Sequence, residues 1–386
     1  MVRIALFHPW LKSRGGGEKV VLEFLKNTKH DVDVYTWIYE QENTFEEFED
    51  FSVKVISRGN SRAFSRTALM RGLYFASSAL FSKIDLRSYD VFFISTSGVA
   101  ELMTLRNYKK GKTLAYVHTI LRDSYRDDVR WNLKNKYKSS LKKMIYLIAV
   151  GIYRRLEKIG WKKIDFPIFN SELSLSRAKE HGLIRDKETI VISPPVEIKN
   201  SKSKTKSKNY FFYLSRFNNK KRQDILIKAW KLFMRDEKNR KYELIFAGDV
   251  DNKSYFEGLK KLARGTNIKI LTRISEEEKT RLISECKAMI YIPFGEDFGI
   301  IPFEVASIGK PLIAMNSGGY VDLIRKKVGF HEVNERFRER EMVFEVYRAL
   351  KEFSSKNTKD KKVSFNELSA KNLAKNIDNF IEEKIN

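Results

Sequence analysis

The chain has 386 residues, 42% of them hydrophobic and 13% aromatic, which is typical of a globular protein long enough for two domains. Its 74 lysines and arginines against 49 acidic residues give a net charge of +25, which attracts polyanions such as nucleic acid or an anionic membrane. The single cysteine, Cys286, excludes an internal disulfide and fits a reducing compartment. The cysteine and the five histidines lack zinc-type spacing, so we expect no metal site.

The chain begins with MVRIALFHPW, which we interpret as a strand because a signal peptide would have a longer apolar core and a cleavage site of small residues. No apolar run approaches the roughly 20 residues that cross a bilayer. We therefore expect a cytoplasmic protein.

The first half of the chain alternates strands with helices. The strands are predicted at residues 3–10, 31–37, 51–56, 89–96, 112–119 and 165–171, and helices at 15–28 and 172–183. Such alternation favours a parallel sheet with helices on both faces.

Three consecutive glycines, Gly15, Gly16 and Gly17, separate the first strand from the first helix. Without side chains they allow the backbone to approach a phosphate at a helix N-terminus. The sequence is neither G-x-G-x-x-G nor a P-loop, so a dinucleotide or ATP site is not indicated. The alternative interpretation is a flexible turn.

His118 ends the predicted strand at 112–119. A lone histidine at a strand end is usually structural, but ligands bind beyond the carboxyl ends of the strands in a parallel sheet. His118 is therefore a candidate catalytic residue.

A possible membrane-binding segment lies at residues 134–163, where basic clusters flank an apolar stretch from Met144 to Tyr153. The stretch is too short to span a bilayer and predicts either a helix at the headgroup surface or a buried helix with basic ends. No compact motif interleaves aromatic and basic residues, so we expect no specific nucleic-acid partner.

Residues 199–209, KNSKSKTKSKN, contain no apolar residue and predict a flexible connector. Beyond it, strands at 210–217, 242–249, 268–274 and 288–294 alternate with helices at 224–236, 254–265 and 275–286. Residues 366–386 form an amphipathic helical pattern. The predicted organisation is therefore a domain at 1–198, the connector, a second domain at 210–365 and a C-terminal helix at 366–386.

Arg216 ends a predicted strand, and Lys221 follows it before a helix. A diphosphate needs permanent cations, and the planar arginine fork suits its oxygens. A solvated loop in a very basic chain is the alternative.

The segment YIPFGEDFGIIPFEVASIGKPLIAMNSGGYVDL predicts a strand, a loop and a helix that stops at Gly309. Glu296 and Glu304 stand on either side of the loop and the start of the helix, where free backbone N–H groups suit a phosphate or sugar hydroxyls. An ordinary loop with a solvated glutamate pair is the alternative.

This segment resembles the E-x7-E signature of retaining glycosyltransferases of family GT4, in the GT-B superfamily. The resemblance implies that Glu304 holds the ribose of a sugar nucleotide and that Glu296 lies beside the donor hexose, in a catalytic position. It also implies that the backbone N–H groups of Phe298, Gly299, Ile300 and Ile301 face the donor.

Other segments carry the resemblance through most of the chain. SRFNNKKRQDILIKA is similar to GRLxxxKxxDxLIxA, which implies that Arg216 and Lys221 bind the donor diphosphate, although Ser215 replaces a glycine. GGGEK resembles the GGxE loop, which adds the three glycines to the donor site. The nucleobase would contact the backbone at Thr272, Arg273 and Ile274, where Thr272 replaces the usual glycine.

YVHTILR resembles the YxHTPxR segment of a mannosyltransferase-like subset, with Ile120 in place of the proline. By this resemblance His118 hydrogen-bonds a hydroxyl of the donor sugar.

We therefore predict an α/β protein of GT-B fold: two doubly wound, Rossmann-like domains that face a cleft, with the last helix crossing back to the first domain. The predicted activity moves a hexose, possibly mannose, from a GDP- or UDP-sugar to a glycan or lipid-linked hydroxyl, with retention and without a metal or other cofactor. We expect peripheral contact with the inner face of an anionic membrane. A sugar-nucleotide epimerase and a basic nucleic-acid-binding protein are the alternatives.

Overall fold

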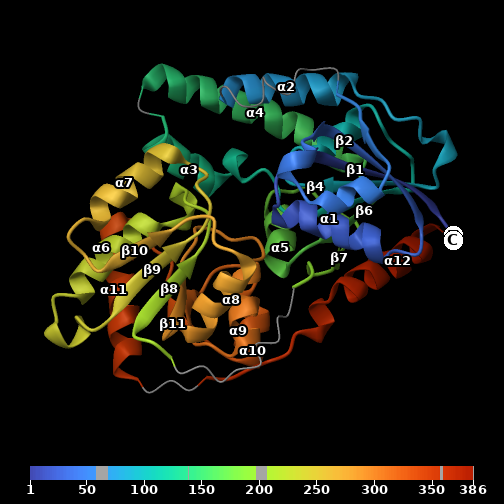
Figure 1. The fold of residues 1–386 in the computed structure, drawn as a ribbon. Coiled ribbons are helices and arrows are strands. Elements are labelled where there is room, and N and C mark those ends of the chain that lie inside the picture. Colours follow the sequence, from blue (N-terminus) through green and yellow to red (C-terminus); the bar gives the residue numbers. More distant parts are fainter. Residues whose placement is uncertain (58–67, 138, 197–206, 357–359, 386) are drawn as a thin grey trace. The chain divides into compact units, whose positions relative to one another are not determined.

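A computed structural model of the chain describes residues 1–57, 68–137, 139–196, 207–356 and 360–385. They form two compact units, Met1–Pro195 with Leu368–Asn386, and Val196–Glu367 (Figure 1). Within the predicted connector at 199–209, only residues 207–209 are among those described.

The first unit is built on a parallel sheet of seven strands in the order β3-β2-β1-β4-β5-β6-β7. The strands are β1 (Arg3–Leu11), β2 (Asp31–Tyr39), β3 (Val53–Val55), β4 (Val91–Thr96), β5 (Thr113–Val117), β6 (Phe166–Phe169) and β7 (Ile190–Val191). The chain proceeds outward in opposite directions from β1 and β4, so the strand order reverses between them. In doubly wound sheets, ligands bind at this switch point, beyond the carboxyl ends of the strands.

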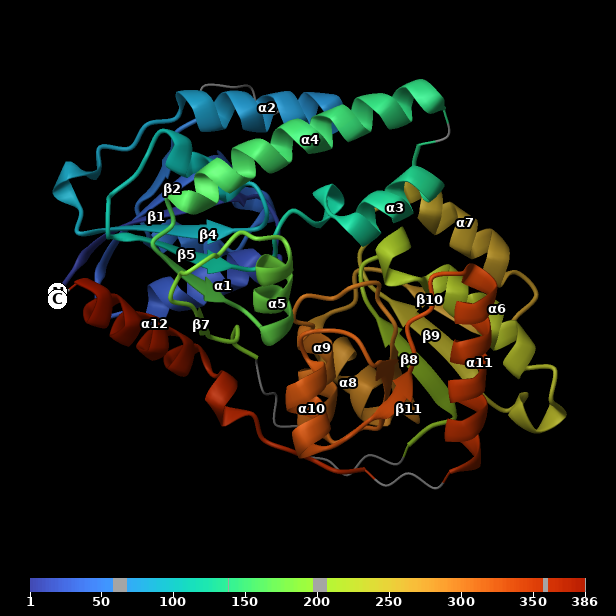
Figure 2. The same ribbon diagram turned by 180° about the vertical axis from the view of Figure 1, so that it is seen from behind.

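Helices cover both faces of the first sheet (Figures 1 and 2). The helices of this unit are α1 (Gly16–Asn27), α2 (Ala68–Phe81), α3 (Arg126–Asn135), α4 (Ser140–Lys162), α5 (Glu172–Glu180) and α12 (Ala370–Ile385), with the 3-10 helix η5 (Ala100–Leu105). On one face, Trp37 and Trp161 pack in a core that contains η5 and part of α4. On the other face, α1 and α12 share a second core.

The C-terminal helix α12 is anchored to the first unit by both apolar and polar contacts. Its Ile377 and Phe380 are buried in the core shared with α1. Its Asp378 accepts hydrogen bonds from the Thr28 hydroxyl at 2.6 Å and from the Lys29 backbone N–H at 3.1 Å, which tie the segment that follows α1 to α12. The amphipathic pattern of the tail is explained by this packing.

The second unit contains a parallel sheet of six strands in the order β10-β9-β8-β11-β12-β13. The strands are β8 (Tyr210–Leu214), β9 (Glu243–Ala247), β10 (Ile268–Leu271), β11 (Ala288–Tyr291), β12 (Leu312–Met315) and β13 (His331–Val333). The helices are α6 (Gln223–Phe233), α7 (Lys253–Ala263), α8 (Glu276–Glu285), α9 (Ile300–Ile308), α10 (Val321–Lys327) and α11 (Glu339–Ser355). The switch point here lies between β8 and β11. The prediction of two doubly wound α/β sheets is confirmed.

Among the described residues, no helix is both long enough and apolar enough to cross a membrane.

Candidate active site

The predicted donor-binding residues follow neighbouring strands of the second sheet. Arg216 and Lys221 come after β8, and Glu296 comes after β11, the strand beside it. Thr272, Arg273 and Ile274 follow β10. Because the sheet is parallel, all these segments leave its carboxyl edge, and the first two flank the switch point.

The two predicted phosphate-binding cations differ in their contacts. Lys221 Nζ lies 2.6 Å from Glu296 Oε2, and their side chains are 19% and 23% exposed. Arg216 is exposed, and its guanidinium has no hydrogen-bond or ion-pair partner among the residues that the structure describes. Thus the structure pairs one cation with the predicted sugar-side carboxylate and leaves the other available.

The loop after β11 contains two glycines at positive φ, Gly295 and Gly299. Gly299 has φ +84° and precedes the first turn of α9, so the N–H groups of Ile300 and Ile301 belong to the free N-terminus of a helix. A Cβ at Gly299 would lie 2.8 Å from Tyr320 Cδ1. Phe298 is buried and stacks on Phe303, with 5.0 Å between ring centroids, which anchors the loop to α9.

Glu304, in α9, is held by a lysine that the sequence did not identify. Lys279, in α8, donates a hydrogen bond to Glu304 Oε1 at 3.1 Å, and the two side chains are 17% and 14% exposed. Burial acts to lower the pKa of Lys279, but the carboxylates of Glu304 and Glu276 outweigh it and raise that pKa. Glu304 Oε2 is sealed from solvent and makes no hydrogen bond within the described residues, although it also lies 3.1 Å from Lys279 Nζ.

The segment predicted to contact the nucleobase adopts an unusual backbone. Arg273 has φ +54°, in the left-handed region, and its side chain is exposed. Within the described parts of the chain, Thr272, Arg273 and Ile274 make no side-chain hydrogen bond or ion pair with the other predicted residues.

At the switch point of the first sheet, the glycine segment packs against two histidines. Gly15 is the N-cap of α1, and Gly16 and Gly17 lie in its first turn. A Cβ at Gly17 would lie 3.5 Å from His8 Cε1 and 3.8 Å from His118 Cδ2. The structure therefore brings two predicted site features together, Gly17 and His118, and adds His8.

A serine links these histidines. His8 is in β1, Ser95 is in β4, and His118 follows β5. Ser95 Oγ lies 2.9 Å from His8 Nδ1 and 2.8 Å from His118 Nε2. Burial lowers the pKa of His8 to about 3, with a further contribution from His118, and burial lowers the pKa of His118 to about 4. Both rings are neutral at physiological pH.

Two buried acids lie in the same unit, near the loop after β4. The Tyr153 hydroxyl is 2.5 Å from the Gly98 carbonyl oxygen, 2.6 Å from Glu101 Oε1 and 3.3 Å from Glu157 Oε1. The tyrosine has one proton for these three oxygens. Burial raises the pKa of Glu101, and burial together with the charge of Glu101 raises the pKa of Glu157 to about 8. These carboxyls are therefore held toward their protonated forms.

Three side chains of these sites were missed by sequence reasoning: His8, Ser95 and Lys279. His8 and Ser95 stand in predicted strands, where their nearness to strand ends was the available signal. Lys279 stands in a predicted helix with several other charges, and nothing in the sequence distinguishes it from them.

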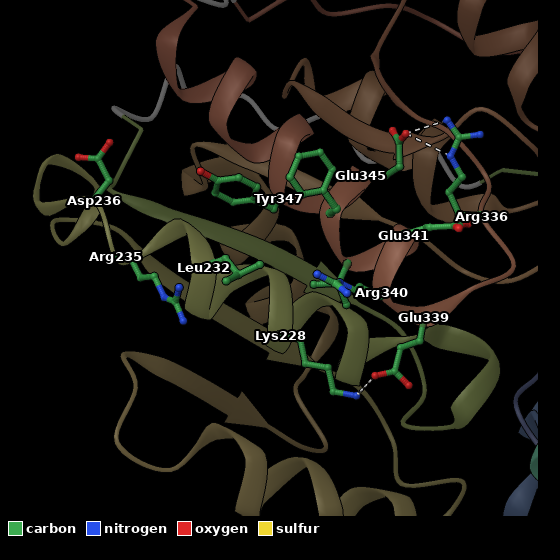
Figure 3. Close-up of a pocket in the computed structure, with 12 residues that line it drawn as sticks. Lys228, Leu232, Arg235, Asp236, Arg336, Glu339, Arg340, Glu341, Glu345 and Tyr347 are labelled. Atoms are coloured by element: carbon green, nitrogen blue, oxygen red, sulfur yellow. Dashed lines mark hydrogen bonds and ion pairs between the residues drawn. The ribbon is translucent and has the colours of Figure 1, made fainter.

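A cavity of about 1140 Å³ in the second unit lies elsewhere, between α6 and α11 (Figure 3). Its lining includes Arg235, Arg340, Leu232, Phe344 and Tyr347, and none of the predicted site residues.

The family described as Glycosyl transferases group 1 matches residues 196–351, which contain the whole charged edge of the second sheet. Residues 196–351 are a glycosyl transferases group 1 domain. The chain is a GT4-like glycosyltransferase.

The similarity of this chain to other proteins extends beyond residues 196–351. The alpha-1,3/1,6-mannosyltransferase ALG2 of Saccharomyces cerevisiae is 25% identical over 377 residues, covering 84% of this chain and 71% of the relative. The structure of Anabaena Alr3699/HepE in complex with UDP-glucose has a TM-score of 0.60 at 16% identity, covering 100% and 96% of the two chains. WaaG, a glycosyltransferase involved in lipopolysaccharide biosynthesis, has a TM-score of 0.60 at 15% identity, covering 98% and 95%. The predicted GT-B fold is confirmed by these likenesses.

Proposed function

We propose that this glycosyltransferase transfers a hexose, specifically mannose, from a nucleoside-diphosphate sugar to a hydroxyl of a glycan or lipid-linked acceptor, with retention. The observation that carries the proposal is the convergence of Arg216, Lys221, Glu296 and the N-terminus of α9 at one switch point. The name of the ALG2 relative, an alpha-1,3/1,6-mannosyltransferase, supports mannose as the transferred sugar, and the UDP-glucose in the HepE structure supports a nucleotide-sugar donor.

The diphosphate would bind between the two cations and α9. Arg216 has a guanidinium without a partner among the described residues, which can bind phosphate oxygens, and the first-turn N–H groups of α9 with its positive dipole end would face the same anion. As the glycosidic bond breaks, negative charge grows on the departing diphosphate, and these groups stabilise it without a divalent metal.

The two glutamates would bind different parts of the donor. Glu304 is held by Lys279, and its Oε2 makes no hydrogen bond within the described residues, so this carboxylate would accept one from a ribose hydroxyl. Glu296 is already held by Lys221 beside the diphosphate position, and it would accept a hydrogen bond from the hexose. In the first unit, His118 would contact a hydroxyl of that sugar.

A thermal-shift comparison of GDP-mannose, UDP-glucose and ADP-glucose tests donor binding first, because a ligand of the native state raises the melting temperature. Transfer is then assayed with EDTA in excess, using mannose-terminated glycan acceptors. We expect GDP-mannose to give the largest shift and to support transfer that survives EDTA. Conversion of the donor to its epimer without nucleotide release would favour an epimerase, and nucleotide release in the absence of acceptor would indicate hydrolysis. A requirement for Mg²⁺ or Mn²⁺ would reject the metal-free proposal.

We further propose that the enzyme acts in the cytoplasm, bound peripherally to the inner face of an anionic membrane through α4. Seven large apolar residues of this helix are 47–62% exposed. They are Leu141, Met144, Ile145, Leu147, Ile148, Ile152 and Ile159. Contiguous exposed apolar surface beside basic residues is typical of helices that lie in a headgroup layer.

Flotation with anionic liposomes tests the membrane proposal. We expect binding at low salt, release at high salt, and loss of binding when Lys142, Lys143, Arg155 and Lys158 are replaced by glutamate. Arg154 is left unchanged, because its guanidinium bonds the Ser124 carbonyl and covers the Tyr125 ring. The apolar contribution is tested with Ile148→Ser and Ile152→Ser, against Phe344→Ser in α11, a residue 59% exposed. Equal binding by all variants would reject this surface.

A further inference from the structure

We propose that His8 and Ser95 are positioning residues that fix the tautomer of His118, so that its outer ring nitrogen has one defined role toward the bound sugar. The proposal rests on the proposed function for the identity of that ligand. The geometry itself does not depend on it: three side chains from consecutive positions in the sheet form one hydrogen-bonded row, His8–Ser95–His118.

Ser95 makes the two rings depend on each other. Its hydroxyl has one proton and lies between His8 Nδ1 and His118 Nε2. It can donate to one ring only and must accept from the other. If His8 carries its proton on Nδ1, Ser95 donates to His118 Nε2, and the proton of His118 is on Nδ1. If Ser95 instead donates to His8 Nδ1 and accepts from His118 Nε2, both rings carry their protons on Nε2. In either case, two neutral rings are protonated on the same-named nitrogen.

The two ends of the row differ in access. His8 is 1% exposed, and its Nε2 is sealed from solvent without a hydrogen-bond partner among the described residues. His118 is partly exposed, and no described residue hydrogen-bonds its Nδ1. Reversing the row would require a proton to enter or leave at His8 Nε2, which no solvent reaches. The row therefore keeps its direction, and His118 Nδ1 stays either a donor or an acceptor during turnover.

Two backbone hydrogen bonds hold the main chain at His118. Its N–H donates to the Thr96 carbonyl at 2.9 Å, and its carbonyl accepts from Asn170 Nδ2 at 2.8 Å. These bonds fix the main chain on both sides of the ring, while Ser95 fixes the ring itself. Burial keeps both imidazoles neutral, and only a neutral imidazole has one ring proton that can be on either nitrogen.

The test measures ring protonation in the full-length enzyme labelled with 15N-histidine, with the two signals assigned through His8→Gln and His118→Gln. We expect both rings to be neutral at pH 7 and protonated on the same-named nitrogen. In Ser95→Ala we expect His118 to become a mixture of tautomers, and in Ser95→Thr, which keeps the hydroxyl, the native form to return. The proposal would be overturned if, in the wild type, one ring were protonated on Nδ1 and the other on Nε2, or if either ring were an imidazolium.

Kinetics separate positioning from simple stability. With the best donor, Ser95→Ala should lower kcat about 10-fold to 100-fold with little change in KM for the donor. It should cause no further loss in a His118→Ala background, because it acts through that ring. Ser82→Ala is the matched control, since Ser82 is a buried serine of the same unit with two hydrogen bonds, to Trp37 and Ile56.

Losses that add in the double variant would also overturn the proposal. Because the spectra are recorded without substrate, an enzyme that uses none of the sugar donors would refute the proposed function while the tautomer test still gives its own result.

Discussion

At the carboxyl edge of the second sheet, glutamates are paired with lysines, whereas at the same edge of the first sheet burial favours uncharged groups. Lys221 holds Glu296 and Lys279 holds Glu304. In the first unit, burial lowers the pKa of His8 and His118 and raises the pKa of Glu157. A charged edge suits a diphosphate, and an uncharged edge can hydrogen-bond hydroxyls without attracting phosphate. The contrast supports the proposal that the second unit binds the anionic part of the substrate.

The largest expected effect comes from removing the cations of the charged edge. Arg216→Ala and Lys221→Ala should each raise the free energy of the transition state by roughly 2–4 kcal/mol, measured as the loss in kcat/KM. Arg235→Ala is the control, because Arg235 is an exposed arginine of the same unit that lines the cavity of Figure 3. Near-normal kcat/KM in both site variants would show that Arg216 and Lys221 do not bind the diphosphate. The proposed contrast between the carboxyl edges of the two sheets would then fail.

The glycines of the two edges should differ in their contribution to stability. Gly299→Ala places a Cβ at φ +84°, 2.8 Å from Tyr320, whose buried ring is held by a hydrogen bond to the Met315 carbonyl at 2.7 Å. We expect the free energy of unfolding to fall by roughly 2–3 kcal/mol. Gly17→Ala meets only ordinary contacts at 3.5 Å or more and should change stability by less than about 0.5 kcal/mol. Denaturant unfolding compares the two variants, and equal losses would contradict the difference in space around the two glycines.

The two glutamates of the charged edge should separate nucleotide binding from turnover. Glu304→Gln should weaken the binding of intact donor and free nucleotide alike by roughly 2 kcal/mol, because the ribose is common to both. Glu296→Gln should spare the free nucleotide and lower kcat. Calorimetric titration with GDP and UDP, beside steady-state kinetics, measures both. Identical behaviour of the two variants would reject separate roles.

The contrast between the edges was only partly predictable from the sequence. Strand ends followed by Arg216, Glu296 or His118 were visible because apolar runs and their breaks are local signals. The row through His8 and Ser95 joins residues 87 positions apart, and it exists because β1 and β4 are neighbours across the switch point. Strand order is a tertiary property, so this contact had no local pattern.

Several helices were also missed by sequence reasoning. The expected elements omitted α2 (Ala68–Phe81) and α11 (Glu339–Ser355), although α11 packs Val346 and Leu350 into the second core. The apolar stretch from Met144 to Tyr153 left two interpretations open, and the structure separates them by residue: Tyr153 turns inward to Glu101, while Ile148 and Ile152 are exposed. Which face of a helix is covered depends on its neighbours and not on its own periodicity alone.

The smallest expected effect tests the uncharged unit through pH. Glu157 has a folded-state pKa raised to about 8, so between its ordinary value near 4.5 and pH 8 the folded protein holds a proton that the unfolded chain releases. Stability of the wild type should therefore fall as pH rises through this window and level off above it. Glu157→Gln removes the titration while it keeps an oxygen that can accept from the Tyr125 hydroxyl.

We expect Glu157→Gln to be more stable than the wild type by roughly 1–2 kcal/mol at pH 9 and to gain little at pH 5. The measurement is the free energy of unfolding in urea at several pH values. Glu42→Gln, at an exposed carboxylate of the same unit, is the control and should run parallel to the wild type. If Glu157→Gln also runs parallel to the wild type, Glu157 is ionised in the folded state. That outcome would confine the contrast between the two units to the histidine row.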